Sequence, residues 1–240
     1  MKLYYIIDAY CGWTYGFNHI FTKFMQDHPD IEIEVINGGL FVGDNKKKMV
    51  DFQQAQTINK QIESYYQMSF GDNYNQLFKD KDFIMDSLGP ARAYSVLKNY
   101  VETPNHAQLT LDIQALFFED GLDLSQADSY TSLISTYQLP TKAMEELSSN
   151  LKQPENLHSD FIKAYEMGGT SFPTLLLEKD GNFFNLINKV RTVDDLEKIS
   201  KQLLRNRKGN YLWKNIISYK MEQNYTSLQM TNQVLWLRRP

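Results

Sequence analysis

Strand-like segments occur only towards the two ends of this 240-residue chain. Residues 2–7 (KLYYII) form an almost continuous apolar run, which is typical of a strand buried on both faces, and residues 31–38 (IEIEVING) alternate apolar and polar side chains. Near the other end, residues 174–178 and 183–187 flank a Lys-Asp-Gly-Asn turn, which predicts a β-hairpin. From about residue 41 to about residue 157 no strand is predicted. Any sheet must therefore be assembled from both ends of the chain.

Helical patterns occupy most of the remaining sequence. Apolar residues at helical spacing predict a helix over residues 12–28, which Pro29 closes. Further helices are predicted through the middle of the chain, an amphipathic helix precedes the hairpin, and another begins near Thr192. The resulting order is β-α-β, a helical block, then α-β-β-α. A thioredoxin fold has this order when a helical block is inserted in its middle, so we expect an α/β protein with a large all-helical insertion.

The element order also divides the chain. We expect residues 1–40 and 156–204 to form the thioredoxin-fold domain, residues 41–155 the inserted helical domain, and residues 205–240 a C-terminal extension. The extension contains seven Lys or Arg and one Glu, whereas the formal net charge of the whole chain is -4. Its interleaved apolar and aromatic residues favour packing against the body, or against a second copy in a homodimer, over binding nucleic acid.

The cysteine count favours a reducing cytoplasm. Cys11 is the single cysteine, so no internal disulfide can form. The apolar run at the N-terminus ends at Asp8, too early for the core of a signal peptide, and no run approaches the roughly 18 apolar residues of a membrane span. We therefore predict no membrane partner. The four histidines are scattered without the spacing of metal ligands, so no metal site is predicted either.

Cys11 lies where the first helix begins, within DAYCGWTYGF (residues 8–17). Unpaired N–H groups and the helix dipole at this position favour a thiolate, so its pKa is expected to fall below the ordinary value. The Thr14 hydroxyl, one turn further along, could donate a hydrogen bond to the sulfur. The alternative is that Cys11 is a small buried apolar residue. Asp8 could handle a proton for Cys11 or could serve only to turn the chain.

Four stretches together resemble one known group of proteins. CGWTYGF (residues 11–17) resembles the Cys-x-Trp-Cys-[Tyr/Trp]-Gly motif of cytoplasmic, DsbA-like thiol-disulfide oxidoreductases of the FrnE-like group. INGGLF (residues 36–41) is similar to a Gly-Gly-Leu stretch after their second strand, and GPARAYSVLKN (residues 89–99) to a helix of their inserted domain. GTSFPTLLL (residues 169–177) resembles their cis-proline loop. The resemblance extends from about residue 2 to about residue 204.

The resemblance implies a role for individual residues. Cys11 would be the nucleophile, and Thr14 occupies the position of the resolving cysteine, so the motif here is Cys-x-x-Thr. Pro173 would be the cis-proline, with its loop packed against the cysteine and pairing with the substrate backbone. Four further residues would line the mouth of the site: Trp13, Tyr15, Ser171 and Phe172.

Without a second thiol, Cys11 cannot release a mixed disulfide by internal attack. Three functions stay open. Cys11 could act as a monothiol oxidoreductase on a small-molecule or protein substrate, with no bound cofactor and with glutathione or another low-molecular-weight thiol as co-substrate. The chain could instead bind a small thiol without forming a disulfide, as the resemblance to kappa-class glutathione transferases and chromene-carboxylate isomerases implies. Finally, the groove could serve a non-catalytic, protein-binding adaptor.

Overall fold

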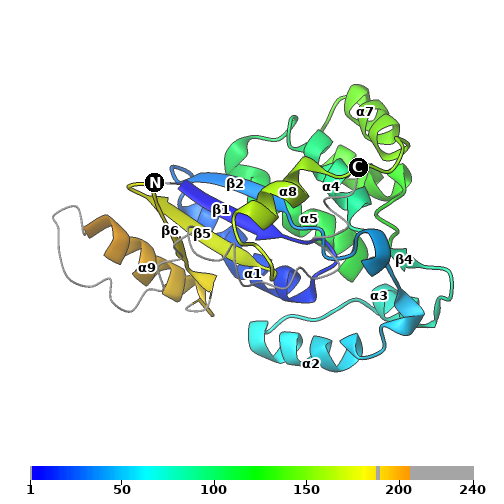
Figure 1. The fold of residues 1–240 in the computed structure, drawn as a ribbon, viewed down its shortest axis with the longest axis horizontal. Coiled ribbons are helices and arrows are strands. Elements are labelled where there is room, and N and C mark those ends of the chain that lie inside the picture. Colours follow the sequence, from blue (N-terminus) through cyan, green and yellow to red (C-terminus); the bar gives the residue numbers. More distant parts are fainter. Residues whose placement is uncertain (1, 188–189, 206–240) are drawn as a thin grey trace.

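The structure, a computed structural model, describes residues 2–187 and 190–205 (Figure 1). Its central sheet has the strand order β2-β1-β5-β6. Strand β1 pairs in parallel with β2 and antiparallel with β5, and β5 pairs antiparallel with β6. These strands come from opposite ends of the chain, as predicted: β1 (Lys2–Ile7), β2 (Glu32–Asn37), β5 (Thr174–Lys179) and β6 (Asn182–Asn185).

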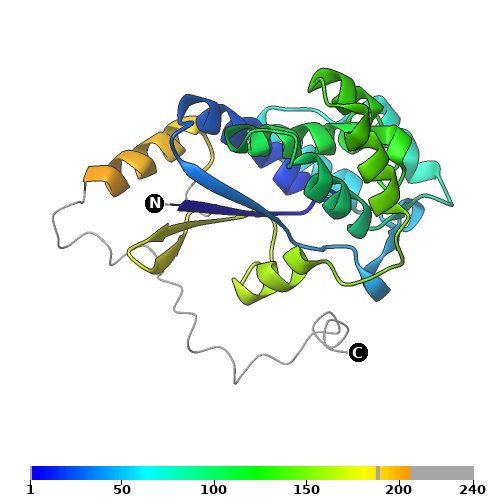
Figure 2. The same ribbon diagram turned by 90° about the horizontal axis from the view of Figure 1, so that it is seen from above.

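Helices cover both faces of the sheet (Figure 2). Helices α1 (Gly12–Asp27) and α9 (Val193–Arg205) lie on one face, and α8 (Ser159–Glu166) lies on the other. The side chains of β1 alternate accordingly. Leu3, Tyr5 and Ile7 join the large core shared with α1, whereas Ile6 packs in a smaller cluster with Ala164 of α8. This is the arrangement of a thioredoxin fold.

The segment between β2 and α8 is mostly helical, and its α5 packs along α1. Its helices are α2 (Ala55–Tyr66), α3 (Asp72–Gln76), α4 (Leu88–Leu97), α5 (His106–Phe118), α6 (Thr131–Thr136) and α7 (Thr141–Leu151). Short 3-10 turns occur at Gly43–Asn45, Met49–Asp51, Leu77–Lys79, Thr103–Asn105 and Ala127–Tyr130.

The expectation of an all-helical insertion needs one correction. Two short strands, β3 (Lys47–Lys48) and β4 (Ile84–Met85), pair antiparallel within it. Each has two residues, too few for an alternating pattern to be visible in a sequence. The expected C-terminal extension, with its predicted packing or dimer contact, lies outside the described residues from 206 onwards. In the described part of the chain, no helix combines the length and apolar character needed to cross a bilayer.

Candidate active site around Cys11

The strand pairing brings the two halves of the candidate site together. Strand β1 leads towards Cys11, and the antiparallel β5 begins immediately after Pro173. Ile6 near the end of β1 lies opposite Thr174 at the start of β5. The loop that holds Cys11 and the loop that holds Pro173 therefore emerge side by side, although 161 residues separate Cys11 from Phe172.

Cys11 is the N-cap residue of α1, as predicted. Its backbone is extended (φ -88°, ψ 110°), and its carbonyl accepts the N–H of Tyr15 at 3.0 Å. Cys11 is 8% exposed, and its thiol donates to the carbonyl oxygen of Phe172 across a distance of 3.3 Å. The Phe172–Pro173 peptide bond is cis. The sulfur is thus held at a helix N-terminus, directly against the proline loop.

The pKa of Cys11 differs from the expectation. Burial raises the pKa of the thiol, and the negative charge of Asp8 adds to this effect. The Thr14 hydroxyl and the backbone N–H groups of Thr14 and Trp13 lower the pKa, but burial outweighs them. The prediction of a depressed pKa was therefore wrong for this structure, because the sequence does not reveal how deeply the thiol is buried.

We accordingly expect a high titration midpoint when alkylation of Cys11 is followed against pH. Because the thiolate is the reactive form, the rate should keep rising beyond pH 8.5, the ordinary thiol pKa. Intact mass gives an unambiguous readout, since Cys11 is the single cysteine. The same titration in denaturant serves as the control and should return to the ordinary midpoint. A folded-state midpoint below the denatured one would contradict the effect of burial.

Thr14 is completely buried, yet its hydroxyl oxygen has no hydrogen-bond partner that meets normal geometry within residues 2–187 and 190–205. The hydroxyl lies close enough to Cys11 to lower the pKa of the thiol. A buried hydroxyl without a partner is costly. A thiolate at Cys11 cannot donate to Phe172 but can accept from Thr14. Deprotonation would therefore provide this hydroxyl with its missing partner.

The residues predicted for the mouth of the site differ in their surroundings. Trp13 and Phe172 are half-buried and Ser171 is exposed, so these three can face a ligand. Tyr15 cannot, because it is 1% exposed and its hydroxyl donates to Glu119 at 2.5 Å. Residues two apart on a helix point in opposite directions, so Trp13 and Tyr15 cannot share one groove. The assignment of Tyr15 to the mouth was wrong.

The glycines of INGGLF explain how the proline loop fits against the sheet. A Cβ at Gly38 would lie 1.9 Å from the ring of Phe172, so a side chain cannot be accommodated there without moving that ring. Gly39 has φ +73°, a left-handed conformation that favours glycine. Asp8 holds the same segment, since its carboxylate accepts the N–H of Leu40 at 2.7 Å and that of Tyr10 at 3.0 Å. These bonds favour the structural interpretation of Asp8.

A buried polar chain beneath the site was not predicted from the sequence. The Tyr5 hydroxyl donates to Asn18 Oδ1 at 2.7 Å, and Asn18 Nδ2 donates to Gln114 Oε1 at 2.6 Å. These bonds orient the Gln114 amide so that Nε2 faces the carbonyls of Asp8, Ala9 and Cys11 at 3.1, 3.3 and 3.5 Å. In the sequence, only the position of Gln114 within the apolar pattern of α5 could have indicated a buried polar contact. Through Gln114, the inserted segment holds the loop that leads to Cys11.

Within the described ranges, no three His, Cys, Asp or Glu residues gather as potential metal ligands.

Comparison with solved structures identifies the class of fold as DsbA-like, within the thioredoxin-fold proteins. The chain superposes on the cytosolic disulfide reductase DsbM from Pseudomonas aeruginosa with a TM-score of 0.71 and 21% identity, covering 85% of this chain and 99% of that one. The same protein solved with GSH gives a TM-score of 0.69 and 20% identity, covering 85% and 100%. A 2-hydroxychromene-2-carboxylate isomerase gives 0.53 and 15%, covering 85% and 95%. No known family and no curated protein matches the sequence itself.

Proposed function

We propose that the protein is a thiol-disulfide oxidoreductase that works through the single nucleophile Cys11. The observation that carries this proposal is the contact between the Cys11 thiol and the Phe172 carbonyl at 3.3 Å, at the N-terminus of α1 and next to a cis proline. A disulfide that enters here would displace the Phe172 carbonyl from the thiol. That carbonyl could then accept a hydrogen bond from the substrate backbone, while N–H groups of α1 and the Thr14 hydroxyl stabilise the thiolate.

The proposed reaction is a thiol-disulfide exchange in two steps, with Cys11 as the attacking thiolate. In the proposed first step, the Cys11 thiolate attacks a substrate disulfide RSSR, forming the protein–SR mixed disulfide and releasing RS⁻. In the second step, an external thiol R′SH gives up its proton and attacks the R sulfur, which yields RSSR′ and restores Cys11. A second R′SH then converts RSSR′ to RSH and R′SSR′, so the substrate disulfide is reduced to two thiols at the expense of two external thiols.

Glutathione is the external thiol that we propose, or another low-molecular-weight thiol of the same kind. The chain has no second cysteine to resolve the mixed disulfide, and one structural neighbour was solved with GSH. We also place the protein in the cytoplasm, where thiols are kept reduced. A neighbour described as a cytosolic reductase supports this location.

Intact mass spectrometry after incubation with glutathione disulfide tests the proposal. We expect one glutathionyl adduct on the wild-type chain, its removal when reduced glutathione is added, and no adduct on Cys11→Ser. The folded state of Cys11→Ser should be verified by circular dichroism. If the folded wild-type chain forms an adduct neither with glutathione disulfide nor with a small neutral disulfide, the oxidoreductase function is refuted.

One observation favours a second candidate. The buried, protonated thiol and the fold shared with a 2-hydroxychromene-2-carboxylate isomerase fit a site that binds a small thiol without covalent capture. In that case reduced glutathione should bind tightly while glutathione disulfide leaves the protein mass unchanged. An adaptor is distinguished in the same assays, because neither form of glutathione would bind or react.

A further inference from the structure

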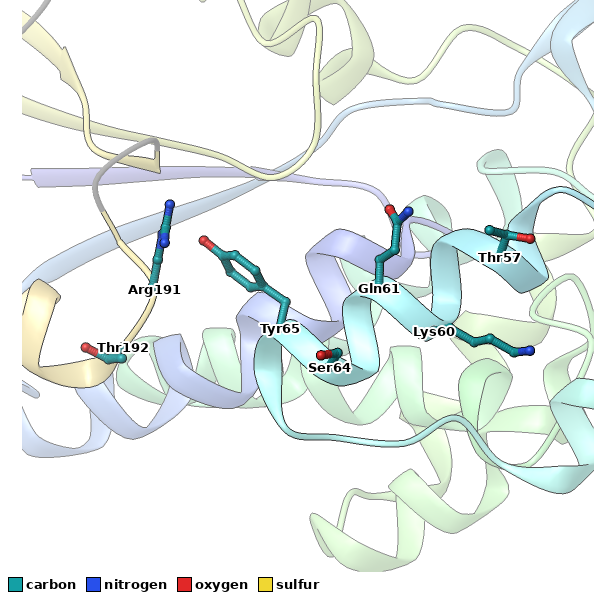
Figure 3. Close-up of a pocket in the computed structure, with 7 residues that line it drawn as sticks. All are labelled: Thr57, Lys60, Gln61, Ser64, Tyr65, Arg191 and Thr192. Carbon is teal, nitrogen blue, oxygen red and sulfur yellow. The ribbon is translucent and has the colours of Figure 1, made fainter.

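A surface hollow of about 740 Å³ lies between α2 and the segment that enters α9 (Figure 3). One side is formed by α2, and Arg191 and Thr192 close the other side. In the close-up, the Arg191 side chain extends alongside the ring of Tyr65, and its guanidinium carbon lies 5.6 Å from the ring centroid. The described lining residues are Thr57, Lys60, Gln61, Ser64, Tyr65, Arg191 and Thr192.

The lining of this hollow is suited to an anion. Of the lining residues just named, two are cationic and none is acidic, and four of the others carry hydroxyl or amide donors, while the Thr192 hydroxyl already donates to Asp195 at 3.0 Å. Lys60 and Arg191 are exposed, and neither forms an ion pair within the described part of the chain. At this end of α9, the carboxylate of Asp195 accepts the backbone N–H groups of Arg191 and Thr192 and the Thr192 hydroxyl. The local positive charge contrasts with the net charge of -4.

The hollow adjoins the first turn of α1. A Cβ at Gly12 would touch Ile62 of α2 at 3.0 Å, so the two helices are in close contact beside Cys11. The half-buried ring of Trp13 lies edge-on to Tyr65, with 5.9 Å between centroids, and Tyr65 itself lines the hollow. The negative charge of the Cys11 thiolate also helps to raise the pKa of the neighbouring Tyr66. Tyr65 therefore joins the hollow to Trp13, two residues beyond Cys11.

From this placement we propose that the hollow binds the carboxylates of the small thiol or disulfide that reacts at Cys11, and so selects anionic partners. This inference rests on the proposed function. Arg191 presents a planar fork that matches a carboxylate, and Lys60 adds a point charge. The ligand class is a low-molecular-weight peptide thiol with free carboxylates.

Two measurements test this inference. The first compares the rates at which Cys11 forms mixed disulfides with glutathione disulfide, neutral hydroxyethyl disulfide and cationic cystamine. Lys60→Gln/Arg191→Gln should lower the rate with glutathione disulfide about tenfold, as expected for two exposed charge pairs, and leave the neutral reagent unaffected. The control variant Lys81→Gln alters an exposed lysine before β4 and should change none of the rates. Added salt should reduce the preference in the wild type.

The second measurement is independent of the reaction. S-methylglutathione cannot form a disulfide, and its binding to the Cys11→Ser chain by calorimetry should weaken about tenfold in the Lys60→Gln/Arg191→Gln background. Equal affinity in the two backgrounds, or equal mixed-disulfide rates, would overturn the inference while leaving the oxidoreductase function intact. Binding that depends on Lys60 and Arg191 without any disulfide reacting at Cys11 would retain the anion site and overturn the proposed function.

Discussion

Substitution of Gln114 by leucine is expected to lower the free energy of unfolding by about 2–4 kcal/mol. Leucine has a similar size but cannot donate to the carbonyls in front of Cys11. The loss is not the sum of three bonds, because the Asp8 carbonyl also accepts from Cys11 N and the Cys11 carbonyl from Tyr15 N. Most of the loss in stability comes from two buried groups. The Ala9 carbonyl loses the hydrogen bond from Gln114, and Asn18 Nδ2 loses Gln114 Oε1 as an acceptor.

Urea unfolding followed by circular dichroism measures this effect. Gln108→Leu is the matched control: it is the same substitution on α5, but Gln108 contacts Asp112 and the exposed Gln26, where water can replace it. We expect the control to change the free energy of unfolding by less than about 0.5 kcal/mol. Alkylation of Cys11 should become faster in Gln114→Leu, because a loosened loop exposes the sulfur. Equal unfolding energies for the two variants would contradict the role assigned to Gln114.

The second large effect is expected from Thr14→Val, which removes the hydroxyl but keeps the shape of the side chain. A hydrogen bond to a charged group contributes about 1.5–3 kcal/mol, so its loss should raise the pKa of Cys11 by about one to two units. The thiolate population at neutral pH then falls by about 10–100-fold. Nucleophilicity rises with pKa and offsets roughly half of this change on a logarithmic scale, which leaves a loss in rate of about three- to tenfold.

The pH profile distinguishes this explanation from general damage to the fold. Well above both pKa values, each variant is fully thiolate, so the rate of Thr14→Val should reach or exceed that of the wild type. Stability should be unchanged or slightly higher, because a buried hydroxyl without a partner has been removed. Thr14→Ser keeps the donor and should follow the wild-type profile. A uniform loss of rate at all pH values would rule out stabilisation of the thiolate by Thr14.

The sequence was informative where a pattern is local. The apolar run in β1, the alternation in β2 and the helical spacing in α1 are each properties of a few consecutive residues. They sufficed to predict the order of elements and the position of Cys11 at the first turn of α1. The role of Pro173 came from the resemblance of its flanking residues, and the strand order explains why that loop lies beside Cys11.

The parts that were missed depend on residues distant in the chain. Tyr15 is buried because Phe118 stacks on its ring at 4.8 Å and Glu119 accepts its hydroxyl. The thiol contacts the Phe172 carbonyl and is buried, and this burial outweighs the N–H groups of the helix terminus in setting the direction of its pKa shift. Gln114 reaches the Cys11 loop from more than a hundred residues away. None of these relationships has a periodicity that could be read before the chain is folded.

The antiparallel pairing of β1 with β5 has a consequence for biosynthesis. During translation, Cys11 leaves the ribosome long before Phe172 and Pro173, and until β5 docks the sulfur lacks both its cover and the carbonyl that accepts its hydrogen bond. A nascent or partly folded chain therefore presents an accessible thiol of ordinary acidity. Completion of the sheet conceals that thiol. Slower alkylation of Cys11 than in the denatured chain is therefore expected to mark a chain whose two ends have joined.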